Sequence, residues 1–491
     1  MLDRIPYYVW PIAALAAWGG ALLFLGLVGF TPYGLDEGAA RALLLNWSTS
    51  DQIANPVFIF EIPDFRAMLF IPLGIYWSGS MIAAKVFTII ISFIGIAALY
   101  YWARKHWTDE VALLASGLML VAPLTLLQID AIDRGVFLLF IISLGLWVDA
   151  KYRTLERSIT GWYFVQMLLV AITITIHPMG LAYPAALAWN WYRVPVSKKH
   201  QQHMFIGLAI ATGIILAMGA GWIALAWFNN PLPALAHIVY TFYPADPVQE
   251  NALVLGTLCF ILLLVVLLFS GRQLLRSLPG QTLLGALVIG LFCADLSWAF
   301  IAQIVILYGG VALLIEVNKK LPLQNFFGQR GIATGAMFII LFWYMQMDRA
   351  RALNIANEVL NPVDQIIHQL SLEAADVNKH FLVASQWPAR TMIAVRRDVL
   401  PLPPPMPDSA TLWKNIKTIS HIVFAHNDPK NYNLAQQLAE LITVTQTVTV
   451  DTGGAIIAIK DAPEENPPAP TSPAPPAEPA TQDAPESRPA S

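Results

Sequence analysis

The chain has 491 residues, of which 57% are hydrophobic and only 12% are charged. Soluble globular domains carry about 25% charged residues, so this composition excludes an ordinary soluble protein. The formal net charge of -3 provides no basic field, and we expect no nucleic-acid partner. The two cysteines, Cys259 and Cys293, lie inside apolar runs and support neither a disulfide framework nor a metal cluster.

The apolar residues gather into stretches that suit membrane helices, because a bilayer core of about 30 Å needs roughly 20 apolar residues per crossing. We expect eleven spans, and therefore a mainly α fold built as a polytopic helical bundle in contact with membrane lipids. Several stretches are shorter than a full crossing and need flanking residues to complete them. The expected spans are approximately 8–30, 81–102, 111–127, 135–148, 162–176, 179–191, 205–228, 252–269, 283–293, 298–315 and 332–347.

The positions of Lys and Arg predict the orientation of this bundle. With the N-terminus in the cytoplasm, 14 of the 18 Lys and Arg residues before Asp348 fall in cytoplasmic segments. The other four, which fall outside, are Arg41, Arg66, Lys85 and Arg134. An odd number of spans then places the C-terminal region outside as well. This pattern fits a bacterial inner membrane protein with a periplasmic C-terminus.

The composition changes after the last expected span. Mixed polar and apolar segments predict a small extracytoplasmic α/β domain, with strands near 380–385, 421–425, 444–450 and 455–460 and helices near 352–375 and 431–441. The last 31 residues contain ten prolines and no apolar cluster, which predicts a disordered tail. The expected domains are therefore a transmembrane domain over 1–347, the α/β domain over 348–460 and the tail over 461–491.

Two acidic groups stand at the expected outer face, close to helix ends. Asp36 and Glu37 follow the first span, where partial desolvation would raise the pKa of a carboxyl and suit a general base. Asp36 could equally cap the following helix, with Glu37 in its first turn. Asp133 and Arg134 lie in a short turn on the same face, where they could cap the next helix. Ionisable groups beside membrane helices are costly and tend to be functional, so their convergence suggests a site.

The order of these motifs resembles a known group of enzymes. An apolar helix is followed by LDEG at 35–38, FEIP at 60–63 and GSMIAAKVF at 79–87. This arrangement is similar to that of the GT-C superfamily of membrane glycosyltransferases, especially the protein mannosyltransferase and lipid A aminoarabinose transferase branches, glycosyltransferase families 39 and 83. The motifs cover roughly residues 1–195. The residues at matching places are Asp36, Glu37, Pro63, Lys85 and Asp133.

The resemblance implies transfer of a sugar from a polyprenyl-phosphate donor to a lipid, glycan or protein acceptor at the outer face. Asp36 would be the general base in an inverting displacement, and Glu37 and Asp133 would position the base, a basic residue or the acceptor. The family commonly has a lysine beside the loop proline, whereas here Arg66 is the candidate replacement. The implied donor phosphate ligands are Arg66, Lys85, Arg134 and His177.

Several of these residues have a second interpretation. His177 precedes Pro178 at a helix boundary, and a structural turn is as good an explanation as a phosphate ligand. Asp36, Glu37 and Asp133 offer the oxygen ligands that Mg²⁺ or Mn²⁺ prefers. Mannosyltransferase-like relatives are viewed as working without a metal, so none is expected to be required. The outer loop 229–251 mixes aromatic and polar groups and could bind sugar or acceptor through Tyr240, Tyr243 and Asp246.

A transporter or flippase for a lipid-linked or polar solute is the alternative function. That class predicts paired repeats with broken helices and ionisable groups near the bilayer midplane. The sequence shows no internal repeat, and its charges lie mostly at helix ends. A catalytically inactive scaffold derived from the family is a third possibility.

Overall fold

The structure is a computed structural model of the chain. It describes residues 9–29, 31–47, 66, 69–71, 76–77, 79–154, 160–193, 198–215, 249–293, 296–320, 331–356, 360, 362–375, 381–404, 406–425, 431–441, 445–451 and 454–459. The chain forms two compact units, and each unit is made of two separate stretches of the sequence. A helical unit holds residues 1–371 together with 389–398, and a second unit holds 372–388 and 399–491.

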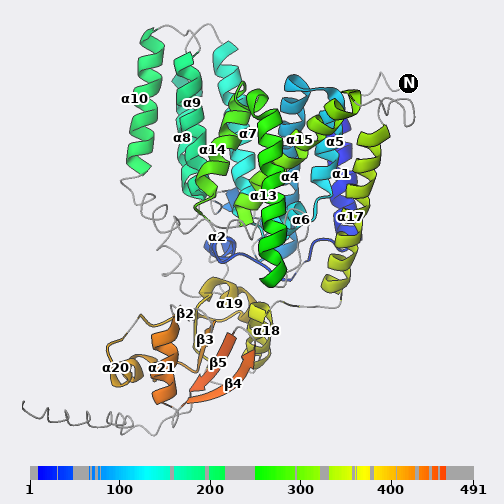
Figure 1. Cartoon of the computed structure of the whole chain (residues 1–491). Coiled ribbons are helices and arrows are strands. Elements are labelled where there is room, and N and C mark those ends of the chain that lie inside the picture. The colour runs from blue at the N-terminus through cyan, green and yellow to red at the C-terminus, as the bar shows by residue number, and fades with distance from the viewer. Residues whose placement is uncertain are drawn as a thin grey trace, which may run out of the picture. The chain divides into compact units, whose positions relative to one another are not determined.

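Helices make up the first unit, and Figure 1 shows most of them standing side by side, with α8, α9 and α10 grouped together. Their bounds are α1 Val9–Phe24, α2 Glu37–Trp47, α4 Met81–His106, α5 Asp109–Leu120, α6 Pro123–Asp130, α7 Arg134–Thr154, α8 Thr160–Ile176, η3 Pro178–Leu181, α9 Ala182–Arg193, α10 Lys198–Ile215, α13 Gln249–Leu274, α14 Leu278–Gly290, α15 Leu296–Lys320 and α17 Gly331–Ala356. Helix α18, Pro362–Ala374, follows α17 in the chain.

Helix α15 is the centre of this unit. It packs against α5, α7, α13, α14 and α17, and every side chain from Ser297 to Gly309 is buried. A helix that is apolar on all sides lies in a protein core or in a membrane, and the neighbours of α15 bury most of it within the bundle. Helix α4 packs against α1, α5 and α7, so the first half of the chain forms a continuous bundle around α15.

Three helices in the described part of the chain are long and apolar enough to cross a membrane: Met81–His106, Gly256–Leu274 and Leu296–Lys320. A fourth crossing is possible if α5 and α6 count as one, although they are bent by 51°. The sequence predicted one continuous span over 111–127, and the structure corrects this. Pro123 begins α6 because it has no N–H to continue the bonding of α5, and the break follows. The total of eleven spans remains a prediction.

The second unit contains a five-stranded mixed sheet in the order β2-β1-β3-β5-β4. The strands are β1 Val383–Ser385, β2 Val399–Pro401, β3 His421–Phe424, β4 Thr445–Asp451 and β5 Gly454–Ile459. Strand β1 runs parallel to β2 and β3, whereas β5 runs antiparallel to β3 and β4. Four of these strands lie where the sequence predicted them, and β2 was missed.

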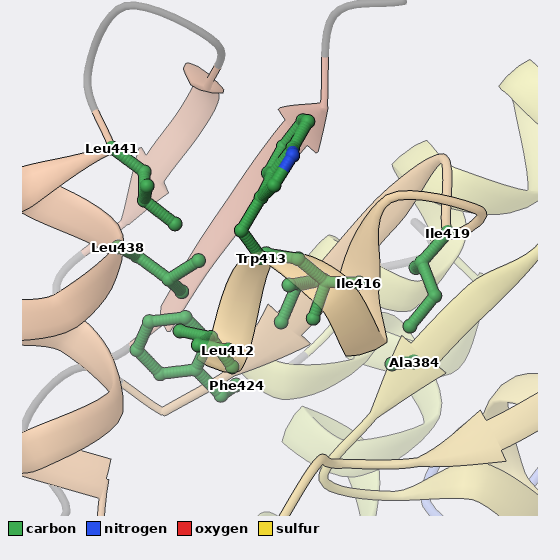
Figure 2. Packing of buried hydrophobic residues seen from close by; sticks show 9 residues of the cluster. Ala384, Leu412, Trp413, Ile416, Ile419, Phe424, Leu438 and Leu441 are labelled. Carbon is green, nitrogen blue, oxygen red and sulfur yellow. The ribbon is translucent and has the colours of Figure 1, made fainter. Parts of the chain in front are cut away.

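An apolar cluster holds this sheet to two helices, α20 Ser409–Ile416 and α21 Tyr432–Glu440. Figure 2 shows Leu412, Trp413 and Ile416 of α20 near Phe424 of β3 and Leu438 of α21. The helix predicted over 352–375 is two helices, because α17 ends at Ala356 and Pro362 starts α18. Helix α19, Pro388–Val395, and α20 were not predicted. The proline-rich tail lies outside the described residues.

Candidate functional site

Asp36 is the N-cap of α2. Its Oδ2 accepts a hydrogen bond from the Ala39 N–H at 3.3 Å, and its own N–H donates to the Ala131 carbonyl at 3.2 Å. Gly34 precedes it with a φ of 80°, a left-handed conformation that glycine adopts without strain. The capping interpretation of Asp36 is therefore confirmed. The backbone bond to Ala131 joins the loop after α1 to the turn after α6, as the predicted convergence of the two acidic segments required.

Arg66 forms an ion pair with Asp36. Its side chain is fully buried, one guanidinium nitrogen donates to Asp36 Oδ2 at 2.7 Å, and the other donates to the Ile132 carbonyl at 2.7 Å. The Asp36 side chain, in contrast, keeps 36% of its surface exposed. The predicted phosphate ligand thus contacts the predicted base directly. Pro63 lies outside the described residues.

The charge state of Asp36 is set by two opposing effects. Burial acts to raise the pKa of its carboxyl, but the guanidinium groups of Arg66 and Arg134 outweigh it and hold that pKa well below the usual range. The sequence predicted a raised pKa, and this prediction was wrong. The interfacial position was visible in the sequence, whereas the approach of two guanidinium groups was not. Asp36 is therefore ionised at neutral pH.

Asp133 caps the next helix. Its Oδ1 accepts from the Gly135 N–H at 3.1 Å and from the Ser297 hydroxyl at 2.8 Å, which ties the start of α7 to the start of α15. Arg134 is the first residue of α7 and acts on Asp36 electrostatically. The structure thus brings Asp36, Arg66 and Arg134 together and places Asp133 beside them in the chain as a helix cap.

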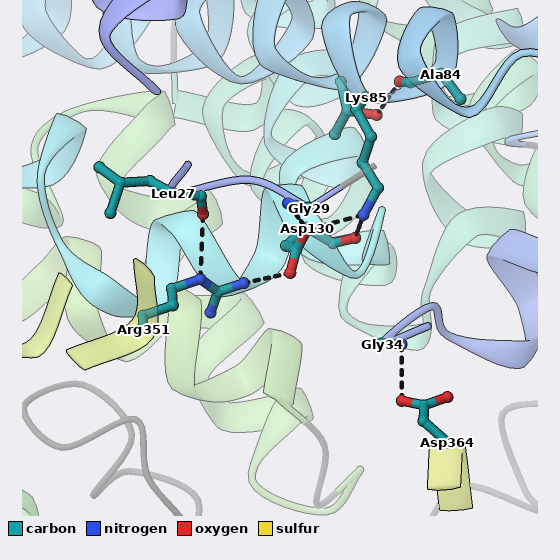
Figure 3. Close-up of polar contacts among 9 residues, drawn as sticks. Leu27, Gly29, Gly34, Ala84, Lys85, Asp130, Arg351 and Asp364 are labelled. Carbon is teal, nitrogen blue, oxygen red and sulfur yellow. Dashed lines mark hydrogen bonds and ion pairs between the residues drawn. The ribbon is translucent and has the colours of Figure 1, made fainter. Parts of the chain in front are cut away.

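Lys85 belongs to a second, more enclosed ionic centre at Asp130, the last residue of α6 (Figure 3). The fully buried Lys85 ammonium donates to Asp130 Oδ1 at 2.9 Å and to the Asp130 carbonyl. Arg351 of α17 donates to Asp130 Oδ2 at 2.5 Å, and the Gly29 N–H donates to Oδ1 at 3.0 Å. Arg351 also reaches the Leu27 carbonyl at 3.2 Å. This centre joins α4, α6 and α17 to the segment after α1.

Glu37 binds a different set of partners from Asp36, at the start of helix α19. Its two carboxylate oxygens accept from the Ala389 N–H at 2.9 Å and the Arg390 N–H at 3.1 Å, and Arg41 pairs with it at 3.3 Å. It therefore caps the N-terminus of α19, whose free N–H groups favour a carboxylate. Burial raises the pKa of Glu37, although these donors oppose the shift.

His177 lies apart from this arrangement in the chain and is buried. It caps η3, with its Nδ1 accepting from the Met179 N–H at 3.0 Å, in agreement with the structural interpretation. The segment η3 packs against α8 and α14. Tyr240, Tyr243 and Asp246, the predicted acceptor loop residues, lie outside the described residues.

The described part of the chain contains no group of three or more His, Cys, Asp or Glu residues arranged to hold a metal. The three carboxylates that could supply oxygen ligands have separate partners: Arg66 for Asp36, the amides of α19 for Glu37, and the start of α7 for Asp133.

Four charged residues of these centres were absent from the predicted set: Asp130, Arg351, Asp364 and Arg390. A signal existed for two of them, because Asp130 shares the acidic turn with Asp133 and Arg351 follows the last expected span on the outer side. Asp364 and Arg390, which pair at 2.6 Å, have no local motif.

Comparison with known proteins supports the fold. No protein-family model matches the chain, and no curated protein matches it by sequence. Among solved structures, ArnT from Cupriavidus metallidurans in the apo state has a TM-score of 0.53 at 13% identity, covering 92% of this chain and 97% of that chain. The same protein bound to undecaprenyl phosphate gives 0.50 at 13% identity, covering 92% of this chain and 98% of that chain.

A second neighbour is the archaeal oligosaccharyltransferase AglB from Archaeoglobus fulgidus, in complex with an inhibitory peptide and a dolichol-phosphate. Its TM-score is 0.51 at 14% identity, covering 93% of this chain and 75% of that chain. Another structure of the oligosaccharyltransferase from this organism is a complex with Zn and sulfate. At 13% to 14% identity the likeness shows the fold alone, which this chain shares with both neighbours and which agrees with the fold expected from the sequence resemblance.

Proposed function

We propose that this chain is a membrane glycosyltransferase that moves a sugar from a polyprenyl-phosphate donor to a lipid, glycan or protein acceptor. The observation that carries the proposal is the partly exposed Asp36 carboxylate against the buried Arg66 guanidinium, at the start of α2. The GT-C fold and two neighbours solved with polyprenyl phosphates, dolichol-phosphate and undecaprenyl phosphate, support the choice of donor. We place the reaction on the periplasmic face of a bacterial inner membrane, with a cytoplasmic N-terminus.

The proposed reaction is a single displacement. The acceptor hydroxyl oxygen forms a bond to the anomeric carbon while the bond from that carbon to the phosphate oxygen breaks, and its electron pair stays on the polyprenyl phosphate. The hydroxyl proton passes to Asp36. Attack opposite the leaving group inverts the anomeric configuration. General-base assistance of this kind contributes about 10² to 10⁴ in rate.

Arg66 and Arg134 are suited to the leaving phosphate, because charge-assisted hydrogen bonds stabilise the negative charge as it develops. They also adjust the base. Both guanidinium groups lower the pKa of Asp36, so an anionic phosphate beside them would offset their charge and raise that pKa. Donor binding would thereby make Asp36 a stronger base at the step that needs one.

The remaining predicted residues have supporting parts in this proposal. Glu37 and Asp133 hold the local backbone, since both cap helices beside Asp36. Lys85 and His177 stay candidates for the donor phosphate, although Lys85 is already bound to Asp130 and His177 to its own turn. Tyr240, Tyr243 and Asp246 stay candidates for the acceptor. No resident metal is part of the proposal.

The test is transfer by the purified protein in lipid nanodiscs, from a polyprenyl-phosphate sugar to lipid or glycan acceptors, followed by mass spectrometry. We expect the Asp36→Asn variant to lose about 10² to 10⁴ in transfer rate. Asp109→Asn is a matched control, because that carboxylate is 70% exposed and pairs only with Arg104 among the bonds described. Unchanged transfer by Asp36→Asn would contradict the base assignment. Lipid flipping without any transfer by the unaltered protein would favour the transporter alternative.

A further inference from the structure

The loop that carries Asp36 is held from both sides by residues far along the chain. The Tyr33 hydroxyl bonds His368 Nδ1 at 2.8 Å, and the Gly34 N–H donates to Asp364 Oδ2 at 2.8 Å. Beyond Asp36, Glu37 accepts the two amide bonds from the start of α19. Both helices involved, α18 and α19, follow the last expected membrane span in the chain.

Asp364 is the centre of these contacts. Its side chain is only 3% exposed, one oxygen accepts from Gly34, and the other pairs with Arg390 at 2.6 Å. Figure 3 shows the Asp364 carboxylate directed at Gly34. Arg390 in turn supplies a backbone N–H to Glu37. The pair of Asp364 and Arg390 thus connects Gly34, which precedes Asp36, with Glu37, which follows it.

This connection fixes the backbone on which the Asp36 carboxylate is mounted. Asp36 itself adds one backbone bond to Ala131 and one side-chain bond to Ala39. Gly34 has a positive φ, which glycine adopts without strain, and its N–H is the one that Asp364 accepts. A general base must lie within hydrogen-bond reach of the proton it takes, so a small rotation here would misplace it.

We propose that Asp364 and Arg390 are positioning residues for glycosyl transfer, which fix the direction of the Asp36 carboxylate without touching substrate. The inference rests on the proposed function. It gives residues 362–371 and 389–398 a role in orienting the catalytic base, in addition to any role in folding.

Two readouts test this proposal on the full-length protein in nanodiscs. The first is amide hydrogen exchange of peptides spanning residues 31–41, which needs no substrate. In Asp364→Asn and Arg390→Gln we expect exchange there to rise by about tenfold or more, with α15 unchanged. The second is steady-state transfer with a saturating acceptor. We expect kcat to fall by about 10- to 100-fold while the donor KM stays within about twofold, because misplacement costs rate rather than binding.

Controls separate positioning from general instability. Arg390→Lys keeps a cation for Asp364 and the backbone N–H for Glu37, so it should recover most of kcat. Asp408→Asn changes the exposed cap of α20 in the other unit and should alter neither readout. Unchanged exchange at residues 31–41, or a looser loop with unchanged kcat, would overturn the positioning role. A looser loop in Asp364→Asn with no transfer by the unaltered protein would instead overturn the proposed function.

Discussion

The helical unit contains two ionic centres, one at Asp130 and one at Asp36, and in each a carboxylate pairs with a buried cation. The two carboxylates differ in how many of their oxygens are bound and in how exposed they are. At Asp130 both carboxylate oxygens are occupied, by Lys85 and Gly29 on one and by Arg351 on the other, and the side chain is 15% exposed. At Asp36 the side-chain bonds within the described part of the chain are both accepted by Oδ2, and 36% of the side chain is exposed. A carboxylate with open surface can receive a proton or a ligand, whereas a saturated one holds helices together.

The largest expected effect is a difference in free energy of unfolding between variants of the two centres. Asp130→Asn places an amide N–H₂ against a cation, because one of the two oxygens that accept from Lys85 and Arg351 becomes a donor. Breaking a buried charge pair costs about 3 to 5 kcal/mol in free energy of unfolding. Asp36→Asn can keep its oxygen at the Oδ2 position for the buried Arg66, and the Asp36 side of the pair is partly solvent-screened, so this variant should cost less, about 1 to 3 kcal/mol.

Denaturant titration of both variants in the same detergent measures this difference. Equal losses of unfolding free energy at the two positions would remove the distinction between a structural and a functional carboxylate.

A second prediction concerns the pH dependence of the Asp36 centre. The lowered pKa of Asp36 means that its pairing stabilises the fold above the unfolded pKa of about 3.9 and that this stability is lost as pH falls through the lower folded value. Transfer should therefore persist in mild acid. In Arg66→Gln burial is opposed by Arg134 alone among the guanidinium groups at Asp36, so the pKa of Asp36 should rise. The acid limb of the rate profile, which lies below about pH 3.5 in the unaltered protein, should then move up into the range above that pH.

Rate profiles between about pH 3.5 and 8 test this shift. Arg104→Gln, which removes an exposed cation paired with Asp109, is the control and should leave the profile in place. A profile of Arg66→Gln that coincides with that of the unaltered protein would show that Asp36 does not control the acid limb.

The smallest effect should appear at Asp133, the neighbouring cap. Asn caps helices as well as Asp does, so Asp133→Asn should keep both stability and transfer, in contrast to Asp36→Asn. Asp133→Ala removes the acceptor for Gly135 and Ser297 and should lower the free energy of unfolding by about 1 kcal/mol. Thermal unfolding together with the transfer assay measures both. A large loss of transfer in Asp133→Asn would give this carboxylate a chemical role.

Local patterns in the sequence predicted the local parts of this site. The Asp36 cap, the turn at Asp133 and the buried strands follow from spacing within a few residues. The break at Pro123 was missed because the apolar run continues across it, so hydropathy alone described one span. The reversed pKa shift of Asp36 and the bonds of Glu37 to the start of α19 depend on residues 30 to 353 positions away, which a local pattern does not contain.

The distance between Glu37 and Arg390 along the chain has a consequence for biogenesis. Synthesis proceeds from the N-terminus, so residues 33–37 leave the ribosome long before the residues that hold them. Until residue 390 has been made and has reached this loop, the loop lacks its contacts with Asp364, Ala389 and Arg390. A nascent chain that stops before residue 390 would therefore contain helices α1 to α17 and still lack an aligned base. Under the proposed function, competence for transfer arises only after residue 390 has been made and has joined this loop.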